Sequence, residues 1–205
     1  MTATAFRSEH DLLGSLPVPQ DAYYGIQTLR AMHNFHLTGV PLSHYPNFVC
    51  ALAMVKQAAA DANYQLGYLN DKKHAAIANA CTQLIEGKHH DQFIVDMIQG
   101  GAGTSTNMNA NEVIANLALE SMGKDKGQYS FLHPNNDVNM AQSTNDAYPT
   151  AIRVGLLLGH NDLLVSLERL IEAFADKGNE FSHVLKMGRT QLQDAVPMTL
   201  GQEFK

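Results

Sequence analysis

The chain has 205 residues, of which 45% are hydrophobic, and this is enough for a substantial core in one large domain or two small ones. Fourteen Lys and Arg residues against twenty Asp and Glu give a formal net charge of -6, and no basic run exceeds two residues, which argues against a nucleic-acid partner. No signal-peptide pattern opens the chain and no window reaches the roughly 18 apolar residues of a membrane span, so we expect a soluble cytoplasmic protein without a membrane partner.

Residues 1–46 contain several prolines and glycines, which predict an irregular N-terminal region. Within it, the run HDLLGSLPVP around Gly14 favours two short extended segments joined by a turn. We expect a helix to follow over about residues 21–33.

Two alanine-rich stretches predict a helical hairpin. The first covers residues 46–66 and opens with a proline at an N1-like position, the second covers residues 71–86, and each is followed by a glycine, as expected after a helix end. Cys50 and Cys81 fall on these two helices among alanines. That setting favours reduced, buried thiols over a disulfide or a metal pair.

The stretch GKHHDQF places His89, His90 and Asp91 side by side. Adjacent histidines on a helix point in different directions, and no other spaced set of Cys or His ligands occurs. We therefore expect a solvated loop here and no metal site.

The stretch GGAGTSTNMNANEVIANLALE, residues 100–120, begins with three glycines in four residues. Such a loop lets the backbone approach a ligand closely, and its hydroxyls and amides then lead into a helix that runs to Met122. The glycine spacing fits neither a dinucleotide fingerprint nor a P-loop. The alternative is a tight glycine turn with a capping cluster.

The stretch HPNNDVNMAQSTNDAYPTA, residues 133–151, gathers amides and hydroxyls ahead of a long apolar helical pattern. Free backbone N–H groups and the helix dipole favour an anion at a helix N-terminus, so neutral donors added there suit a carboxylate. The alternative is that the segment 143–146 only caps the helix, since Ser, Thr, Asn and Asp are the preferred N-cap residues.

The longest pattern predicts one helix over about residues 147–181, with Pro149 tolerable only in its first turn. A helix of about thirty residues is about 45 Å long, more than a compact domain of this size needs. Its apolar stripe is therefore expected to pack against helices outside this chain or in another subunit. The stripe consists of Leu156, Leu157, Leu163, Leu164, Leu167, Leu170, Ile171 and Phe174.

The last stretch, GRTQLQDAVPMTLGQEF, carries hydrogen-bonding side chains in extended surroundings and then a new helical start at about Thr199. No C-cap signal follows before Lys205, so we expect the chain to be truncated within this element.

The three polar stretches, together with HDLLGSLPVPQDAYYGIQTLRA near the N-terminus, resemble the aspartase/fumarase superfamily, and its aspartase branch in particular. The resemblance spans nearly the whole chain. It implies a mainly α fold, with an N-terminal helical domain and short β-hairpin over residues 1–142 and the start of a long-helix bundle over residues 143–205. It also implies a homotetramer whose active sites are shared between subunits.

The resemblance further implies a carbon–nitrogen lyase that removes ammonia from L-aspartate in a reversible anti elimination, giving fumarate through an enediolate. Fixed hydrogen-bond donors stabilise such a doubly charged intermediate. By resemblance, Thr104 and the pair Ser143–Thr144 would hold the β-carboxylate and Asn145 would contact the amino group. Thr190 would hold the α-carboxylate, with Gln191 beside it.

The family's catalytic base is a serine in a flexible glycine- and serine-rich loop, and the resemblance places it beyond Lys205. We therefore expect no catalytic residue in this chain, no activity from the chain alone and no cofactor. Gln191 stands where fumarases commonly carry histidine, which favours the aspartase branch. Asn136 stands where fumarases have an acidic residue after His133 in a second carboxylate site, which argues against that site here.

Two alternatives are compatible with the same sequence. A class II fumarase would hydrate fumarate on the same scaffold. A non-catalytic helical assembly module would use the hydroxyls and amides only as helix caps. A nucleotide-binding enzyme is disfavoured by the glycine spacing.

Overall fold

The computed structural model describes residues 5–99 and 102–205, so Gly100 and Gly101 of the expected ligand loop lie outside the described residues. The chain divides into two compact units, residues 1–158 and 159–205. The domain boundary expected at 142/143 stays a prediction. Among the described residues, no helix has the length and apolarity needed to cross a membrane.

The first unit opens with an antiparallel hairpin of β1 (Phe6–Asp11) and β2 (Gly14–Pro19), in which Asp11 pairs with Gly14. This confirms the two extended segments and their turn. Helix α1 (Ile26–Asn34) begins later than the expected start near residue 21. The reason is tertiary: the start of α1 is set by buried carboxylates from other elements, which accept its first N–H groups.

The predicted helical hairpin is confirmed as α2 (Pro46–Gln65) and α3 (Asp71–Ile85). Asn70 caps α3 by accepting a hydrogen bond from the backbone N–H of Lys73 at 3.0 Å. Both cysteines are free thiols; Cys81 is buried, as expected, whereas Cys50 is only half-buried.

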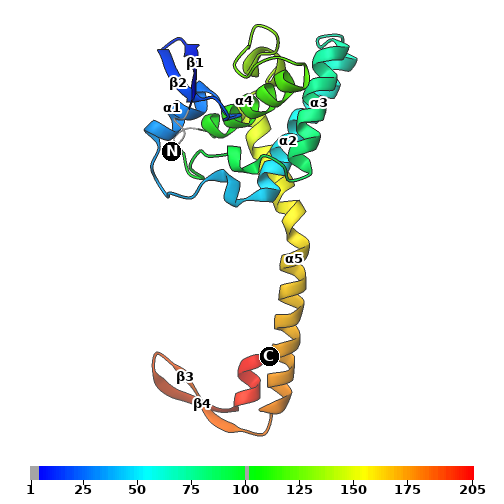
Figure 1. Cartoon of the computed structure of the whole chain (residues 1–205). Coiled ribbons are helices and arrows are strands. Elements are labelled where there is room, and N and C mark those ends of the chain that lie inside the picture. The colour runs from blue at the N-terminus through cyan, green and yellow to red at the C-terminus, as the bar shows by residue number, and fades with distance from the viewer. Residues whose placement is uncertain (1–4, 100–101) are drawn as a thin grey trace. The chain divides into compact units, whose positions relative to one another are not determined.

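Helix α4 (Thr104–Ser121) lies at the centre of the first unit, between α1 on one side and α2 and α3 on the other (Figure 1). From Thr106 to Leu119, every residue except Met108 is buried. A helix buried on all sides is a core helix. The position of α4 therefore fixes where its N-terminal residues lie in the fold.

Three short helical turns connect these elements: η1 (Leu42–His44), η2 (His90–Gln92) and the π-helical η3 (Pro134–Val138). The expectation of a solvated loop at GKHHDQF is wrong in part. A ring nitrogen of His90 bonds the carbonyl of Leu84 at 2.7 Å, and the Gln92 amide oxygen accepts from the backbone N–H of Tyr23 at 2.8 Å. These bonds hold the turn against the core.

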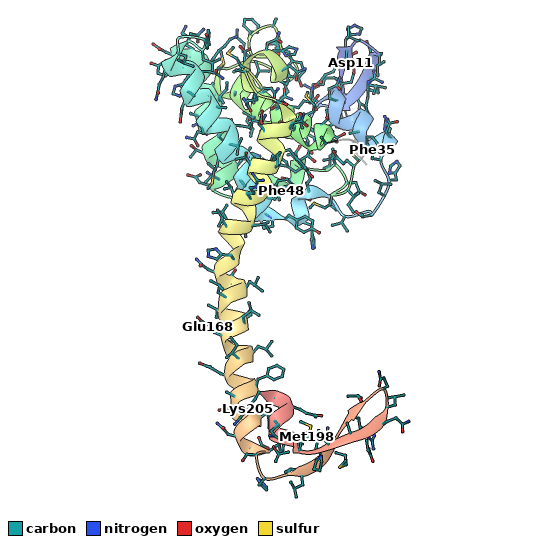
Figure 2. All side chains as sticks on the ribbon, turned by 180° about the vertical axis from the view of Figure 1, so that it is seen from behind. Asp11, Phe35, Phe48, Glu168, Met198 and Lys205 are labelled. Atoms are coloured by element: carbon teal, nitrogen blue, oxygen red, sulfur yellow. The ribbon has the colours of Figure 1, made fainter. Side chains whose placement is uncertain are left out.

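Helix α5 (Thr144–Glu180) runs from the first unit into the second. It begins three residues before the expected start at 147, so Pro149 lies in its second turn and not in its first. Proline has no N–H to donate to the carbonyl of Asn145, four residues earlier. In Figure 2, Phe48 marks the place where α2 meets the first turns of α5, and the Phe48 and Tyr148 rings lie 5.8 Å apart there.

The second unit contains the later part of α5, a hairpin of β3 (Leu185–Thr190) and β4 (Gln193–Thr199), and the 3-10 turn η4 (Leu200–Phe204). The extended segment expected around Thr190 is thus one half of a hairpin. Thr199 begins the expected helical turn with a capping box, in which its backbone N–H donates to Gln202 Oε1 at 2.8 Å.

The apolar stripe of α5 is exposed in this chain. Leu163 is 60% exposed, Leu170 51% and Ile171 67%. Burial of such side chains is strongly favourable, so an exposed row of them is typical of an interaction surface.

Candidate functional site

The N-termini of α4 and α5 come together in the first unit. Gly103, just before α4, has φ +82°, and a Cβ built on it would lie 2.4 Å from Cγ of Tyr148 in the second turn of α5. The side-chain amide of Asn107, in the first turn of α4, donates to Thr144 Oγ1 at 3.3 Å. Two helix N-termini, each the positive end of a helix dipole, are therefore neighbours.

The predicted carboxylate-binding residues of this unit lie at these two helix starts. Thr104 is the first residue of α4 and is exposed, Ser143 and Asn145 are exposed, and Thr144 is half-buried. Their hydroxyl and amide groups are uncharged hydrogen-bond donors at a position where helix dipoles favour an anion.

Ser143 also caps α5, so the capping interpretation is correct for this residue. Its Oγ accepts from the N–H of Asn145 at 3.2 Å, and its carbonyl accepts from the N–H groups of Asp146 and Ala147 at 3.1 and 3.0 Å. A serine whose oxygen accepts a backbone hydrogen bond still has its own hydroxyl proton to donate. Capping and anion binding are therefore compatible here.

Thr190 and Gln191 belong to the second unit. They lie at the turn of the β3–β4 hairpin, both are exposed, and Gln191 has φ +48°. The first unit ends at residue 158, so the predicted site residues at the starts of α4 and α5 and those at the β3–β4 turn lie in different units.

Lys56 was not predicted from the sequence. This α2 residue is fully buried, and its Nζ donates to Asn107 Oδ1 at 2.6 Å, Asn139 Oδ1 at 2.8 Å and Gln142 Oε1 at 2.9 Å. The three acceptors come from α4 and from the segment that leads into α5. A signal was present, because Lys56 stands at helical spacing between the buried residues Leu52 and Ala60.

Burial lowers the pKa of the Lys56 ammonium from 10.5 to about 7. The thiol of Cys81, on α3, is the nearby titratable group, and burial raises its pKa to about 12, so it stays neutral. The hydrogen-bond partners of Lys56 Nζ are three neutral amide oxygens, and only the ammonium form offers a donor to each, so this geometry favours the protonated amine while burial opposes it.

A second buried charge organises the start of α1. Glu112 of α4 is 1% exposed and accepts from the N–H groups of Gly25, Gln27 and Thr28 at 2.8–3.0 Å and from the Thr28 hydroxyl at 2.6 Å. Desolvation raises the pKa of the Glu112 carboxyl to about 7. Its partners are the unpaired N-terminal donors of α1, so its role is to attach that helix to α4.

The His133 segment lines a separate cavity of about 570 Å³, together with Gln27, Met108, Glu112 and Tyr129. His133 Nδ1 accepts from the N–H of the second following residue at 3.0 Å and of the third at 3.3 Å, which leaves Nε2 as the protonated nitrogen of the neutral ring. Burial lowers the pKa of His133. Asn136, by contrast, is exposed.

The fold and this site define a mainly helical protein in which two adjacent helix N-termini present uncharged donors suited to a carboxylate. The family model described as "Lyase" matches residues 14–205, and the chain belongs to this family.

Among curated proteins, the chain is similar to the aspartate ammonia-lyase of Pseudomonas fluorescens, with 75% identity over 204 residues, covering 100% of this chain and 43% of that protein. The enzyme of that name from Pseudomonas aeruginosa is 78% identical over 198 residues, covering 97% of this chain and 42% of that protein. The predicted resemblance to the aspartase branch is thereby confirmed, and the chain spans less than half the length of these relatives.

Solved structures agree on the fold. The fumarate lyase:delta crystallin from Brucella melitensis in native form is 62% identical with a TM-score of 0.86, covering 97% of this chain and 45% of that one. The class II fumarase from Schistosoma mansoni is 39% identical with a TM-score of 0.81, covering 97% of this chain and 42% of that one. The mainly α prediction is confirmed.

Proposed function

We propose that the full-length protein containing this chain is an aspartate ammonia-lyase, which eliminates ammonia from L-aspartate to give fumarate and runs in reverse. The single observation that carries this proposal is the pairing of the α4 and α5 N-termini, with Thr104 and the segment Ser143–Asn145 at their ends. Relatives of that name at 75–78% identity support it.

The chemistry explains the residue types. Removing a proton from Cβ, next to a carboxylate, places a second negative charge on that group before the C–N bond breaks. In our proposal, Thr104, Ser143 and Thr144 donate to this β-carboxylate as it becomes the enediolate. Donors fixed in place before the reaction stabilise the developing charge without reorganisation, and loss of one typically costs about a hundredfold in rate.

Asn145 would contact the departing amino group, while Thr190 would hold the α-carboxylate with Gln191 beside it. We propose that these two groups of residues meet in a homotetramer whose active sites are shared between subunits. The exposed α5 stripe supports this assembly, because burying it needs further helices.

The base that removes the Cβ proton is proposed to be a serine on a segment beyond Lys205, so the chain alone would be inactive. The elimination as proposed uses substrate and side chains, without a cofactor. We also propose a cytoplasmic location, which the free thiols of Cys50 and Cys81 support, since disulfides form in oxidising compartments.

The test uses the full-length protein with L-aspartate as substrate and follows the formation of fumarate by its ultraviolet absorbance. Thr144→Val should lower kcat/KM about a hundredfold. Thr82→Val is the matched control, because this exposed α3 hydroxyl donates only to the carbonyl of Ala78 on its own helix, and it should retain full activity. Equal activity of the two variants would refute the assigned site, and turnover by the 205-residue chain alone would refute the proposed position of the base.

The same assay separates the alternatives. A fumarase would consume fumarate without ammonia, whereas the proposed lyase requires ammonia in the reverse direction. A non-catalytic assembly module would bind no dicarboxylate, which calorimetry with succinate measures directly.

A further inference from the structure

The strongest feature outside the predicted site is the buried hydrogen-bond network beneath the start of α5. In its protonated form, Lys56 Nζ has three hydrogens and no acceptor capacity, and each hydrogen meets an amide oxygen, those of Asn107, Asn139 and Gln142, at 2.6–2.9 Å. Among the described residues, none of the ion pairs involves Lys56. Its charge is therefore compensated by oriented dipoles alone.

Because Lys56 can only donate, it determines which way each of these amides faces. Asn107 must turn Oδ1 towards Lys56, so its NH₂ group points the other way. Its two N–H bonds then reach Asn139 Oδ1 at 2.9 Å and Thr144 Oγ1 at 3.3 Å. Asn139 is fixed in the same manner, since its Nδ2 donates to the carbonyl of Gln142 at 3.1 Å.

The orientation of the Asn107 amide affects Thr144, which is half-buried at the start of α5. A hydroxyl oxygen that accepts a hydrogen bond from an amide keeps its own proton for another acceptor. If the Asn107 amide faced the opposite way, its oxygen would compete for that proton. The direction of the Asn107 amide thus decides whether Thr144 serves as a donor.

We propose that Lys56 is a positioning residue for the dicarboxylate site, because its hydrogen bond to Asn107 makes the Thr144 hydroxyl a donor to the bound carboxylate. Lys56 acts through Asn107 and touches no substrate. When protonated, its ammonium group also favours the negative charge that develops at the site. This inference rests on the proposed function.

The test is a double-mutant cycle in the full-length protein, with succinate, an unreactive dicarboxylate, as the calorimetric probe. Thr144→Val and Lys56→Met should each weaken succinate binding about 10- to 100-fold, the usual effect of losing a hydrogen bond to a charged group. The double variant should bind no more weakly than the weaker of the two single variants, because Lys56 acts through Thr144. A lysine that only connected helices would give losses that multiply, and that result would overturn the proposal.

Lys73→Met is the matched control. Lys73, on α3, pairs with Asp137 of η3 at 2.7 Å and so anchors the neighbouring turn without contacting the Lys56 network. It should leave succinate binding within about twofold, and thermal unfolding of all variants should show comparable folding. Should Lys56→Met fail to fold, Asn107→Ala, the middle member of the chain of bonds, replaces it in the same cycle.

The outcomes separate the two proposals. If the wild-type protein binds no succinate, or Thr144→Val binds it normally, the proposed function fails and the inference fails with it. If Thr144→Val weakens binding but Lys56→Met and Asn107→Ala do not, the proposed function stands and the role of Lys56 is refuted.

Discussion

Replacing Gly103 by alanine tests the packing of α4 against α5. Gly103 has φ +82°, and a Cβ there would lie 2.4 Å from Cγ of Tyr148 and 2.6 Å from both Cδ atoms. A left-handed conformation costs a non-glycine residue about 1–2 kcal/mol. Forcing a methyl group into a packed contact costs about 1–3 kcal/mol more. Gly103→Ala should therefore lower the free energy of unfolding by about 3 kcal/mol, a large part of the stability of a typical domain.

Gly67 provides a control, because its backbone φ angle is almost the same as that of Gly103. Its φ is +80°, and a Cβ added there would meet no atom within 4 Å, so Gly67→Ala should cost only the backbone part, about 1 kcal/mol. Urea unfolding followed by circular dichroism gives both values. Equal losses in the two variants would show that Tyr148 does not contact this position and would refute the close approach of the two helix starts.

Two further predictions concern charge and capping. The pKa of Glu112 is raised from 4.5 to about 7, so the folded chain binds this proton more tightly than the unfolded chain does. The stability it contributes is fully present below pH 4.5 and declines by about 3 kcal/mol as the pH rises through 7. In Glu112→Gln this decline should vanish, which urea unfolding of both proteins at several pH values would reveal; parallel curves would contradict it. Asn70→Ala removes the cap of α3 and should cost about 1 kcal/mol in thermal unfolding, whereas Asn70→Asp should keep most of it. No difference between these two variants would count against the cap.

The sequence by itself determined the elements whose signals are local. Proline at the first position and glycine after the last set the ends of α2, and α3 lies between its Asn70 cap and Gly87. The clusters of hydroxyls and amides at the starts of α4 and α5 could also be predicted from the sequence, because capping and anion binding at a helix N-terminus use the same residue types. The apolar stripe of α5 could be predicted as well, since the helical spacing of its residues is visible in the sequence whatever packs against it.

Only the tertiary structure decided how distant groups combine. It placed the start of α1 at Ile26, because Glu112, more than eighty residues away, accepts the N–H groups there. It also brought Lys56 and Gln142, 86 residues apart in the sequence, into hydrogen-bond contact, which makes a lysine of an alanine-rich helix a buried donor beneath the proposed carboxylate site. The physical reason is that a local pattern reports which face of a helix is buried, whereas a buried charge must be matched by hydrogen-bond partners that the fold brings from elsewhere in the chain.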